Sequence, residues 1–359
     1  MKDIYRPEIL HLGRAEDNAR IESLLANSTV QICDTIYQQL EELMKIRIPN
    51  LNFSEQEMAN AIHTHLENRK LDEYGLWIYY PWSNRLVHTL LEEDFIAVRT
   101  NRNQLKITVE EQNILKAKTV GIIGLSVGQS IALTMAMERI CGTIKLADFD
   151  EAELSNLNRI RTGIHNLSIN KTIIAAREIA EIDPFINVVI YSQGLNENNM
   201  RDFMLDGKLN ILVEVCDGLD IKIKSRIQAK QYGIPVLMET NDKCLFDIER
   251  FDLDAEYPIF HGLINQQDID SLAYHTGESR LNLIKKIVNA DNLSSRMKDS
   301  FVEIGKSIRS WPQLASSVVL GGAVTTDVAR KILLGEDVMS GRCYFDIDAV
   351  LKGYSILNN

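Results

Sequence analysis

The sequence has few cysteines, no long apolar run and no excess of basic residues. Its five cysteines lie at least 28 positions apart, so it contains no C-x-x-C pair of the kind that holds a structural zinc ion. No apolar run reaches the ~18 residues of a membrane span, and the opening stretch, MKDIYRPEILHLGRAED, lacks the apolar core of a secretory signal. We therefore expect a soluble, cytoplasmic protein without a membrane partner.

Basic residues are outnumbered by acidic ones. The chain has 39 Lys and Arg against 50 Asp and Glu, which gives a formal charge of −11. A surface of that sign repels polyanions, so nucleic acid is not expected as a partner. Apolar residues make up 45% of the 359 positions, which excludes a disordered chain and allows one large domain with an extension, or two domains.

The first part of the chain shows helical spacing. Apolar residues recur at that spacing between residues 14 and 70, with a break at Pro49. Residues 74–98 are rich in aromatic residues and more strand-like, and the charged stretch RTNRNQLKITVEEQ follows them. We predict a mainly helical N-terminal extension over residues 1–96 and a single large domain over residues 97–359.

Beyond that boundary, β-rich runs alternate with helical patterns. The runs TVGIIGL, TIKLADF, INVVIYS, NILVEV and IPVLME are separated by helical patterns such as NKTIIAAREIAEI and IKIKSRIQAKQYG. Such alternation predicts parallel strands with covering helices, and the apolar strands indicate a sheet that is buried on both faces. The predicted fold class is α/β, with a doubly wound, mostly parallel sheet and a Rossmann-like nucleotide-binding half.

Three further segments complete this organisation. Residues 252–310 interrupt the alternation and predict a variable helical insertion. The stretch LASSVVLGGAVTTDVARKILLG predicts a long helix, and a last strand is expected near CYFDIDAV.

The first predicted strand runs into a turn of small residues, GIIGLSVGQSIALTMA. In it, Gly124, Ser126 and Gly128 fall between a strand and a helix. Small residues let the backbone approach a phosphate, and a helix start offers free N–H groups and the positive end of a dipole. The fingerprint is incomplete, because G-x-G-x-x-G needs one more glycine, and a turn that only packs a helix on a sheet explains it equally well.

The stretch ADFDEAELSNLNR ends the second predicted strand with polar residues. Asp148 follows Gly124 by 24 positions, where an acidic side chain can reach a ribose hydroxyl. A guanidinium such as Arg159 can fork across phosphate oxygens and an amide such as Asn156 can steady them, which a triphosphate needs and a nicotinamide does not. Structural roles also exist, since Asp148 can cap a turn and Arg159 can form an exposed ion pair.

These motifs, taken in order, resemble those of the ThiF/MoeB-type adenylyltransferases, whose fold is shared with the adenylation domains of ubiquitin-activating enzymes. The resemblance covers roughly residues 97–352. GLSVGQS is similar to the Gly-rich loop of that family, LADFDEAELSNLNR to its D-x-D…S-N-L-x-R signature, and EVCDGLD to its D-x-x-D strand end. RTNRNQ resembles its R-Y-N-R-Q entry segment, and LGGAVTTDVARKILLG its penultimate helix.

The resemblance implies a role for each site residue and two cofactors, ATP and Mg²⁺. The implied roles are the phosphate loop for Gly124, Ser126 and Gly128, the ribose for Asp148 with Asp150 in support, the β- and γ-phosphates for Asn156 and Arg159, the α-phosphate region for Lys171, and the magnesium ion for Asp217. Lys171 also suits the exposed start of a helix, and Asp217 also suits the N-cap of a helix that begins near Asp220.

Arg102 resembles the arginine finger that members of this family insert into the site of the partner subunit. The resemblance therefore implies a homodimer. Arg99 lies three positions away and is the alternative finger.

The expected reaction follows from the same resemblance and agrees with elementary chemistry. A carboxylate is already ionised at pH 7, so its attack on the α-phosphorus of ATP needs no general base. Pyrophosphate leaves with several negative charges, so catalysis consists mainly of charge neutralisation and in-line positioning. We expect an adenylyltransferase, a nucleotidyltransferase that activates the C-terminal carboxylate of a small ubiquitin-like protein or peptide as an acyl-adenylate, as a ubiquitin-like modifier activating enzyme does.

The sequence departs from the family in its cysteines and histidines. Residues 252–310 contain no cysteine, so the zinc site of many relatives is not expected, and His261 and His275 are isolated. Cys244 is a candidate for thioester formation, but a small buried side chain is the favoured explanation for it, and Cys216 is expected to be buried in its strand.

Three other functions stay open. The chain is also compatible with an enzyme like the family's tRNA threonylcarbamoyladenosine dehydratases, although its acidic balance argues against RNA. A non-catalytic scaffold is a second alternative, but such subunits lose phosphate-site residues that are present here. An NAD-dependent Rossmann dehydrogenase is the third, and it has no role for Asn156, Arg159 and Lys171.

Overall fold

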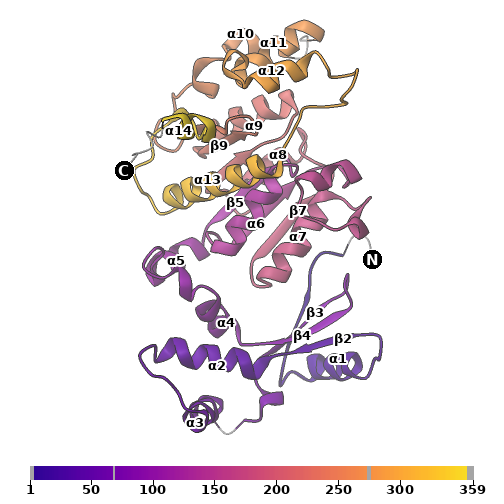
Figure 1. The fold of residues 1–359 in the computed structure, drawn as a ribbon, viewed down its shortest axis with the longest axis vertical. Coiled ribbons are helices and arrows are strands. Elements are labelled where there is room, and N and C mark those ends of the chain that lie inside the picture. Colours follow the sequence, from indigo (N-terminus) through magenta and orange to yellow (C-terminus); the bar gives the residue numbers. More distant parts are fainter. Residues whose placement is uncertain (1–3, 68, 273–275, 354–359) are drawn as a thin grey trace. The chain divides into compact units, whose positions relative to one another are not determined.

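The computed structural model describes residues 4–67, 69–272 and 276–353, and these residues form two units. The first unit comprises residues 4–112 with 180–185, and the second comprises residues 113–179 with 186–353. Figure 1 shows the elements in chain order. His275 lies outside the described residues.

The first unit combines a small sheet with helices. Its sheet has the order β1-β3-β4-β2, in which β3 pairs antiparallel with β1 and β4, and β2 pairs parallel with β4. The strands are β1 (Glu8–His11), β2 (Gln31–Asp34), β3 (Leu76–Tyr80) and β4 (Arg85–Thr89), and the helices are α1 (Ala15–Leu25), α2 (Ile36–Arg47), α3 (Glu55–Leu66), α4 (Glu92–Arg99) and α5 (Val109–Lys116), whose end belongs to the second unit.

This unit differs from the predicted helical extension in two respects. The strand-like stretch does hold β3 and β4, but β1 and β2 were not predicted, because four-residue strands are too short to show a period of two. The predicted boundary after residue 96 falls inside α4, and the two units separate after Gln112.

Residues 180–185 belong to the first unit although residues 113–179 of the second unit precede them in sequence. The Tyr80 hydroxyl donates a hydrogen bond to the Ala180 carbonyl at 3.2 Å. The Arg99 guanidinium donates to the fully buried Asp183 carboxylate at 2.9 Å. The first unit is therefore completed by a segment that the chain supplies much later.

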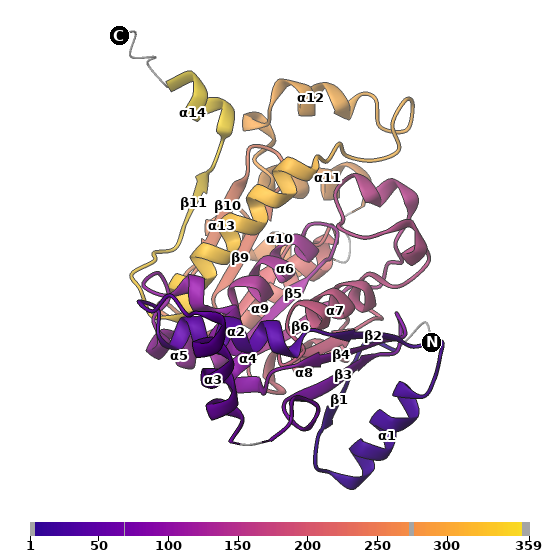
Figure 2. The same ribbon diagram turned by 60° about the horizontal axis from the view of Figure 1, so that its bottom comes forward.

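The second unit is built on a seven-stranded sheet of order β11-β10-β9-β8-β5-β6-β7. Strands β5 to β9 are parallel, and β10 and β11 continue the sheet antiparallel beyond β9 (Figure 2). The strands are β5 (Thr119–Ile123), β6 (Thr143–Ala147), β7 (Asn187–Tyr191), β8 (Ile211–Glu214), β9 (Val236–Thr240), β10 (Leu245–Glu249) and β11 (Gly341–Tyr344). The predicted α/β fold with a doubly wound, mostly parallel sheet is confirmed.

Helices cover both faces of this sheet because its strands are apolar on both sides. A Cβ atom on Gly121 would meet Phe203 of α8 at 2.9 Å, whereas a Cβ atom on Gly128 of α6 would meet Ile122 at 2.8 Å. Adjacent strand residues thus face helices on opposite sides. Helices α6 and α13 lie side by side on one face (Figure 1), and α8 and α9 pack into the core on the other. The helices are α6 (Gly128–Glu138), α7 (Lys171–Ile182), α8 (Met200–Leu205), α9 (Leu219–Tyr232) and α13 (Ala315–Leu333).

The predicted insertion over residues 252–310 consists of short helices, and the chain ends in an unpredicted one. The insertion contains α10 (Gln266–Asp270), α11 (Gly277–Ile287) and α12 (Ser295–Phe301). The predicted last strand stops at Tyr344, because the Asp346 carboxylate accepts hydrogen bonds from two backbone N–H groups, of Asp348 and Ala349, and so starts α14 (Ile347–Gly353). Across the described residues, no helix combines the length and the apolar character needed to cross a bilayer.

Candidate functional site

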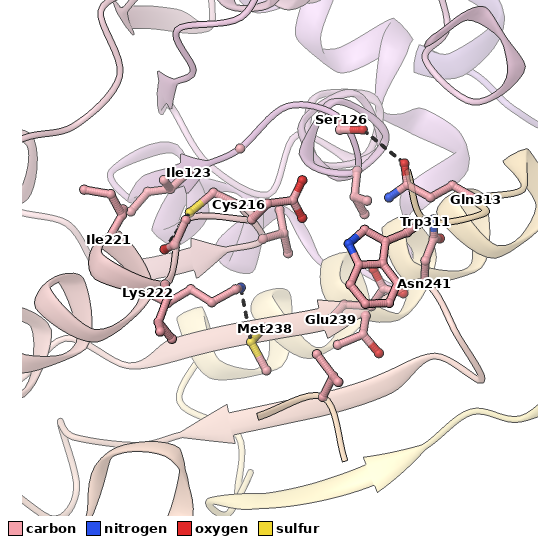
Figure 3. A pocket seen from close by; sticks show the side chains of 18 of the residues that line it. Ile123, Ser126, Cys216, Ile221, Lys222, Met238, Glu239, Asn241, Trp311 and Gln313 are labelled. Carbon is pink, nitrogen blue, oxygen red and sulfur yellow. Dashed lines mark hydrogen bonds between the residues drawn. The ribbon is translucent and has the colours of Figure 1, made fainter. Parts of the chain in front are cut away.

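A cavity of about 430 Å³ lies at the carboxyl ends of the parallel strands of the second unit. Strand β5 lies between β6 and β8, so the chain leaves β5 toward one side of the sheet and later returns to the other. Open α/β sheets bind ligands outside the carboxyl ends of the strands at such a switch point. The cavity is lined by residues that follow β5, β6, β8 and β9 and by the segment from α11 to residue 313 (Figure 3).

The glycine-bearing turn after β5 passes close to the end of β8. Gly124 has φ +88°, and a Cβ atom there would lie 2.7 Å from the Cys216 Cα atom, so only glycine fits this position. Among the described residues, the backbone N–H groups of Ser126 and Val127 have no hydrogen-bond acceptor. Because α6 begins at Gly128, the turn presents free N–H groups and a helix start, which is the arrangement that binds phosphate.

Gly128 itself has a packing role. A side chain there would collide with Ile122, so glycine lets α6 rest on β5. Gly128 does not line the cavity, whereas Gly124 and Ser126 do.

Asp148 links the two loops at the end of β6. One carboxylate oxygen accepts from the Leu125 N–H at 2.6 Å, and the other accepts from the Asp150 N–H at 2.8 Å. Burial raises the pKa of Asp148, and these two hydrogen bonds oppose that shift. The residue lines the cavity, so it both caps the turn and faces the space where a ribose is expected.

Lys171 is the first residue of α7 and lines the cavity. Its side chain is buried, and its ammonium group donates to the half-exposed Asp150 carboxylate at 2.8 Å. A phosphate in the cavity would compete with Asp150 for this ammonium group.

Arg159 and Asn156 border the site without lining the cavity. The Arg159 Nε atom donates to the Ser126 hydroxyl at 3.0 Å. Burial lowers the pKa of Arg159, and the negative charge of Asp217 opposes this shift. Asn156 is buried and its side chain accepts from the Glu153 N–H at 3.1 Å, so in this structure it stabilises the local turn.

Asp217 follows β8 and lines the cavity with an exposed side chain. Within the described ranges its carboxylate makes no hydrogen bond and no ion pair. The N-cap of α9 is Gly218, so the capping role that the sequence allowed for Asp217 does not apply. The carboxylate is available to a ligand or a cation.

This site suits Mg²⁺ held jointly with a nucleotide. In the part of the chain that the structure describes, no cluster of three or more His, Cys, Asp or Glu side chains is arranged to hold a metal. Magnesium commonly binds through one or two carboxylates, with water and substrate phosphates as its other ligands. Asp217 fits that pattern.

The two cysteines considered in the sequence differ in location but share a raised pKa. Cys216 was expected inside its strand, but it follows β8, is partly exposed and lines the cavity. Burial and the nearby Glu214 carboxylate raise its pKa. Cys244 is buried, and burial raises its pKa to about 12. Thiols with raised pKa values are poor nucleophiles, so the geometry gives no support to a thioester.

A buried charge network behind the cavity was missed in the sequence. Arg226 of α9 donates to Glu214 and to Glu249, each at 2.6 Å, and all three side chains are fully buried. Lys222 lines the cavity and lies 3.1 Å from Glu214. Burial raises the pKa of Glu214, but the nearby Lys222 and Arg226 lower it overall. The only signal was an acidic residue inside the apolar run ILVEV.

Glu239 at the end of β9 was also missed. Its side chain is 4% exposed and lines the cavity, and burial raises its pKa to about 8. Nothing in the sequence around it, IPVLMETND, matched a known motif.

The two candidate arginine fingers belong to the first unit. Arg99 is held by the ion pair with Asp183. Arg102 lies in a short 3₁₀ helix, Asn101–Asn103, with an exposed side chain. Its role in a partner subunit stays a prediction.

Comparisons with known proteins agree with the resemblance. The chain is 44% identical over 281 residues to the uncharacterized protein MT1398 of Mycobacterium tuberculosis (strain CDC 1551 / Oshkosh), covering 78% of this chain and 39% of that protein. It is 26% identical over 155 residues to the tRNA threonylcarbamoyladenosine dehydratase of Bacillus subtilis (strain 168), covering 43% of this chain and 60% of that protein. The chain thus spans less than two thirds of the length of each relative.

Two solved structures from E. coli are also similar. The crystal structure of MccB with AMPCPP and MccA shares 16% identity with a TM-score of 0.49, and covers 86% of this chain and 87% of that chain. The crystal structure of the tRNA N6-threonylcarbamoyladenosine dehydratase TcdA with AMP shares 15% identity with a TM-score of 0.48, and covers 67% of this chain and 95% of that chain.

The ThiF family model matches residues 100–243. That segment contains the glycine turn, Asp148, Lys171 and Asp217, and it ends within the loop that follows β9. Over this segment, the chain is similar to the ThiF family.

Proposed function

We propose that this protein is an ATP-dependent adenylyltransferase that activates a carboxylate as an acyl-adenylate and releases pyrophosphate. One observation carries the proposal: the free N–H groups of the glycine turn, the Lys171 ammonium group and the Asp217 carboxylate meet at one cavity. A triphosphate with a magnesium ion needs these three kinds of group.

The residues of the chain would share the work of holding ATP. The glycine turn and the start of α6 would bind phosphate oxygens, and Asp148 would accept a hydrogen bond from the ribose. Lys171 would exchange its contact with Asp150 for the α-phosphate, and Arg159 would turn from the Ser126 hydroxyl toward the outer phosphates. Asp217 would hold Mg²⁺, which neutralises charge on the leaving pyrophosphate.

The finer substrate assignment is the C-terminal carboxylate of a ubiquitin-like protein or peptide. The ordered motifs described above support it. A tRNA substrate is the second candidate, because the named relative from Bacillus subtilis is a tRNA threonylcarbamoyladenosine dehydratase. The formal charge of −11 weighs against tRNA, since RNA binding depends on positive surface.

Calorimetry with ATP and Mg²⁺, and separately with NAD, tests the adenylation proposal. Arg159→Ala and Asp217→Ala should each weaken ATP binding by about 1–3 kcal/mol, the loss expected for a charged hydrogen bond. Asp252→Ala is the matched control, because Asp252 pairs with Arg250 and does not line the cavity. Binding of NAD in place of ATP, or equal ATP affinity in all four proteins, would contradict the proposal.

A further inference from the structure

One part of the cavity has no role in the nucleotide contacts proposed above. It lies at the end of β9, where the insertion and the segment before α13 meet the sheet. In Figure 3, Glu239 and Asn241 lie beside Trp311, whereas Lys222 and Met238 lie on another side of the cavity. Its apolar lining comes from α11, α12 and the residues between them and α13: Ile284, Ile287, Val288, Leu293, Met297 and Trp311.

Glu239 is the central polar residue of this part. Met238 and Glu239 alternate on β9, so Met238 meets Lys222 of α9 while Glu239 faces α13 on the opposite side of the sheet. A Cβ atom on Gly321 of α13 would lie 2.6 Å from a Glu239 carboxylate oxygen, so the glycine leaves room for the carboxyl group. Glu239 is therefore buried between β9 and α13.

Glu239 and its neighbours hold unused hydrogen-bonding groups. Both carboxylate oxygens of Glu239, the Thr240 hydroxyl and both amide atoms of Asn241 are buried without a partner at full hydrogen-bond geometry among the described residues, although the nearby Cys244 thiol stabilises the Glu239 carboxylate. Buried polar atoms are nearly always paired in native proteins. Three consecutive residues that break this rule at a cavity indicate that a ligand supplies the partners.

The surroundings of Glu239 favour a ligand that donates hydrogen bonds. Burial raises the pKa of Glu239 to about 8 because it disfavours the carboxylate, and a ligand that donates hydrogen bonds or carries positive charge would stabilise that carboxylate. The neighbouring titratable group is the Cys244 thiol on the turn before β10, whose own pKa is raised to about 12 by burial and by Glu239. The two lysines that line the cavity are both bound to other carboxylates, Lys222 to Glu214 and Lys171 to Asp150. No cation of the described chain therefore occupies the place of the missing donor.

We propose that Glu239 and Asn241 bind the nitrogen of the substrate residue whose carboxylate is activated, and that the apolar lining holds the side chain of that residue. The substrate class is an α-amino-acid-type carboxylate with an apolar side chain. The nitrogen is either the ammonium group of a free amino acid or the amide N–H of a peptide C-terminus. This inference rests on the proposed adenylation and assigns its substrate.

Binding of matched carboxylates tests the inference. The probes are leucine and phenylalanine, their N-acetyl derivatives, and the nitrogen-free acids 4-methylpentanoate and 3-phenylpropanoate. Calorimetry is performed with and without the non-hydrolysable analogue AMPCPP and Mg²⁺, so that probe binding does not depend on the reaction. We expect at least one nitrogen-bearing probe to bind tenfold or more tightly than its nitrogen-free counterpart.

Variants of Glu239 assign this preference to the site. Glu239→Leu should reduce binding of the nitrogen-bearing probe to the level of the nitrogen-free acid, with ATP affinity unchanged. Glu239→Gln separates the two sources, because a glutamine still accepts from an amide N–H but gives no charge to an ammonium group. Glu197→Gln is the control, since Glu197 is exposed and pairs with Lys224 outside the cavity.

The failures are distinguishable. Equal binding of all probes, no binding of any probe, or a preference that survives Glu239→Leu would overturn the nitrogen site. A nitrogen preference without ATP binding would leave the nitrogen site standing and overturn the adenylation proposal.

Discussion

At the scale of single residues, Gly124 shows how one backbone position fixes the site. Replacement by alanine should destabilise the second unit by about 2–5 kcal/mol, because a left-handed backbone costs an L-residue ~1–2 kcal/mol and overpacking adds ~1–3 kcal/mol. Gly207→Ala is the matched control, since Gly207 has φ +61° and no described atom lies within 4 Å of the place that its Cβ atom would take. Gly207→Ala should cost only the ~1–2 kcal/mol of the left-handed backbone. Urea unfolding compares the two, and equal losses would contradict the close approach to β8.

Glu239 predicts a pH dependence of stability. Its pKa is about 8 in the folded chain against an ordinary value of 4.5, so the folded state binds a proton that the unfolded state releases between these values. Its stabilising contribution is therefore complete below pH 4.5 and is lost as the pH rises through 8, with a limiting slope of about 1.4 kcal/mol per pH unit.

Glu239→Gln removes this titration. The free energy of unfolding of the variant relative to wild type should therefore increase from pH 5 to pH 8, as measured by urea denaturation at each pH. A constant difference across that range would mean that the carboxyl group has an ordinary pKa.

The site could be predicted from sequence only where a residue sits in a local motif. Asp148 and Asp217 follow strands that the apolar pattern had located, Lys171 begins a predicted helix, and the fold brings all three to the cavity. The position of Glu239 in the site could not be predicted, because its surroundings include Gly321 and the insertion, which are distant in sequence. The sequence also could not show which hydrogen bonds a polar side chain makes. Asn156 has an amide that suits a phosphate, but in the structure this amide accepts from Glu153 and stabilises its own turn.

At the scale of elements, helix α9 is anchored to the sheet by the buried Arg226. Arg226→Met leaves Glu214 and Glu249 buried without their shared cation, which should cost about 3–5 kcal/mol. Lys224→Met on the same helix removes an exposed ion pair with Glu197 and should cost about 0–1 kcal/mol. Hydrogen exchange of the β8 and α9 amides measures the loss of stability in each variant. Similar protection of these amides in the two variants would contradict the anchoring role of Arg226.

Elements with sustained periodicity were predictable, and short ones were not. The five parallel strands and α13 appear in the sequence as apolar runs of sufficient length. Strands β1 and β2 have four residues each, which is too few to show a period of two. Helix α14 begins at a single capping carboxylate, and its seven residues give no clear helical period. Hydrophobic periodicity also cannot predict that a charged residue is buried. From the sequence alone, Arg226 is expected to be an exposed helix residue, because its two buried partners are not known.

At the scale of the whole molecule, the predicted homodimer gives a complementation test. If Arg102 acts in the site of the partner subunit, Arg102→Ala and Asp217→Ala proteins should each lack pyrophosphate exchange. Mixed in equal amounts, they should regain roughly a quarter of wild-type activity, because half of the dimers are hybrid and each hybrid has one intact site. A mixture of Arg159→Ala with Asp217→Ala should stay inactive, since every site then carries a defect. No recovery in the first mixture would exclude a finger supplied by the partner subunit.

Residues 180–185 give the first unit an order of assembly. Asp183 supplies the buried carboxylate that pairs with Arg99, and Ala180 accepts a hydrogen bond from Tyr80. A ribosome that adds ~5–20 residues per second delivers this segment several seconds after residues 4–112 have been made. During that interval the nascent first unit lacks the partners of Arg99 and Tyr80. These partners arrive only when the chain has passed through the glycine turn and the polar loop of the second unit, so the first unit cannot be completed before synthesis of the second unit has begun.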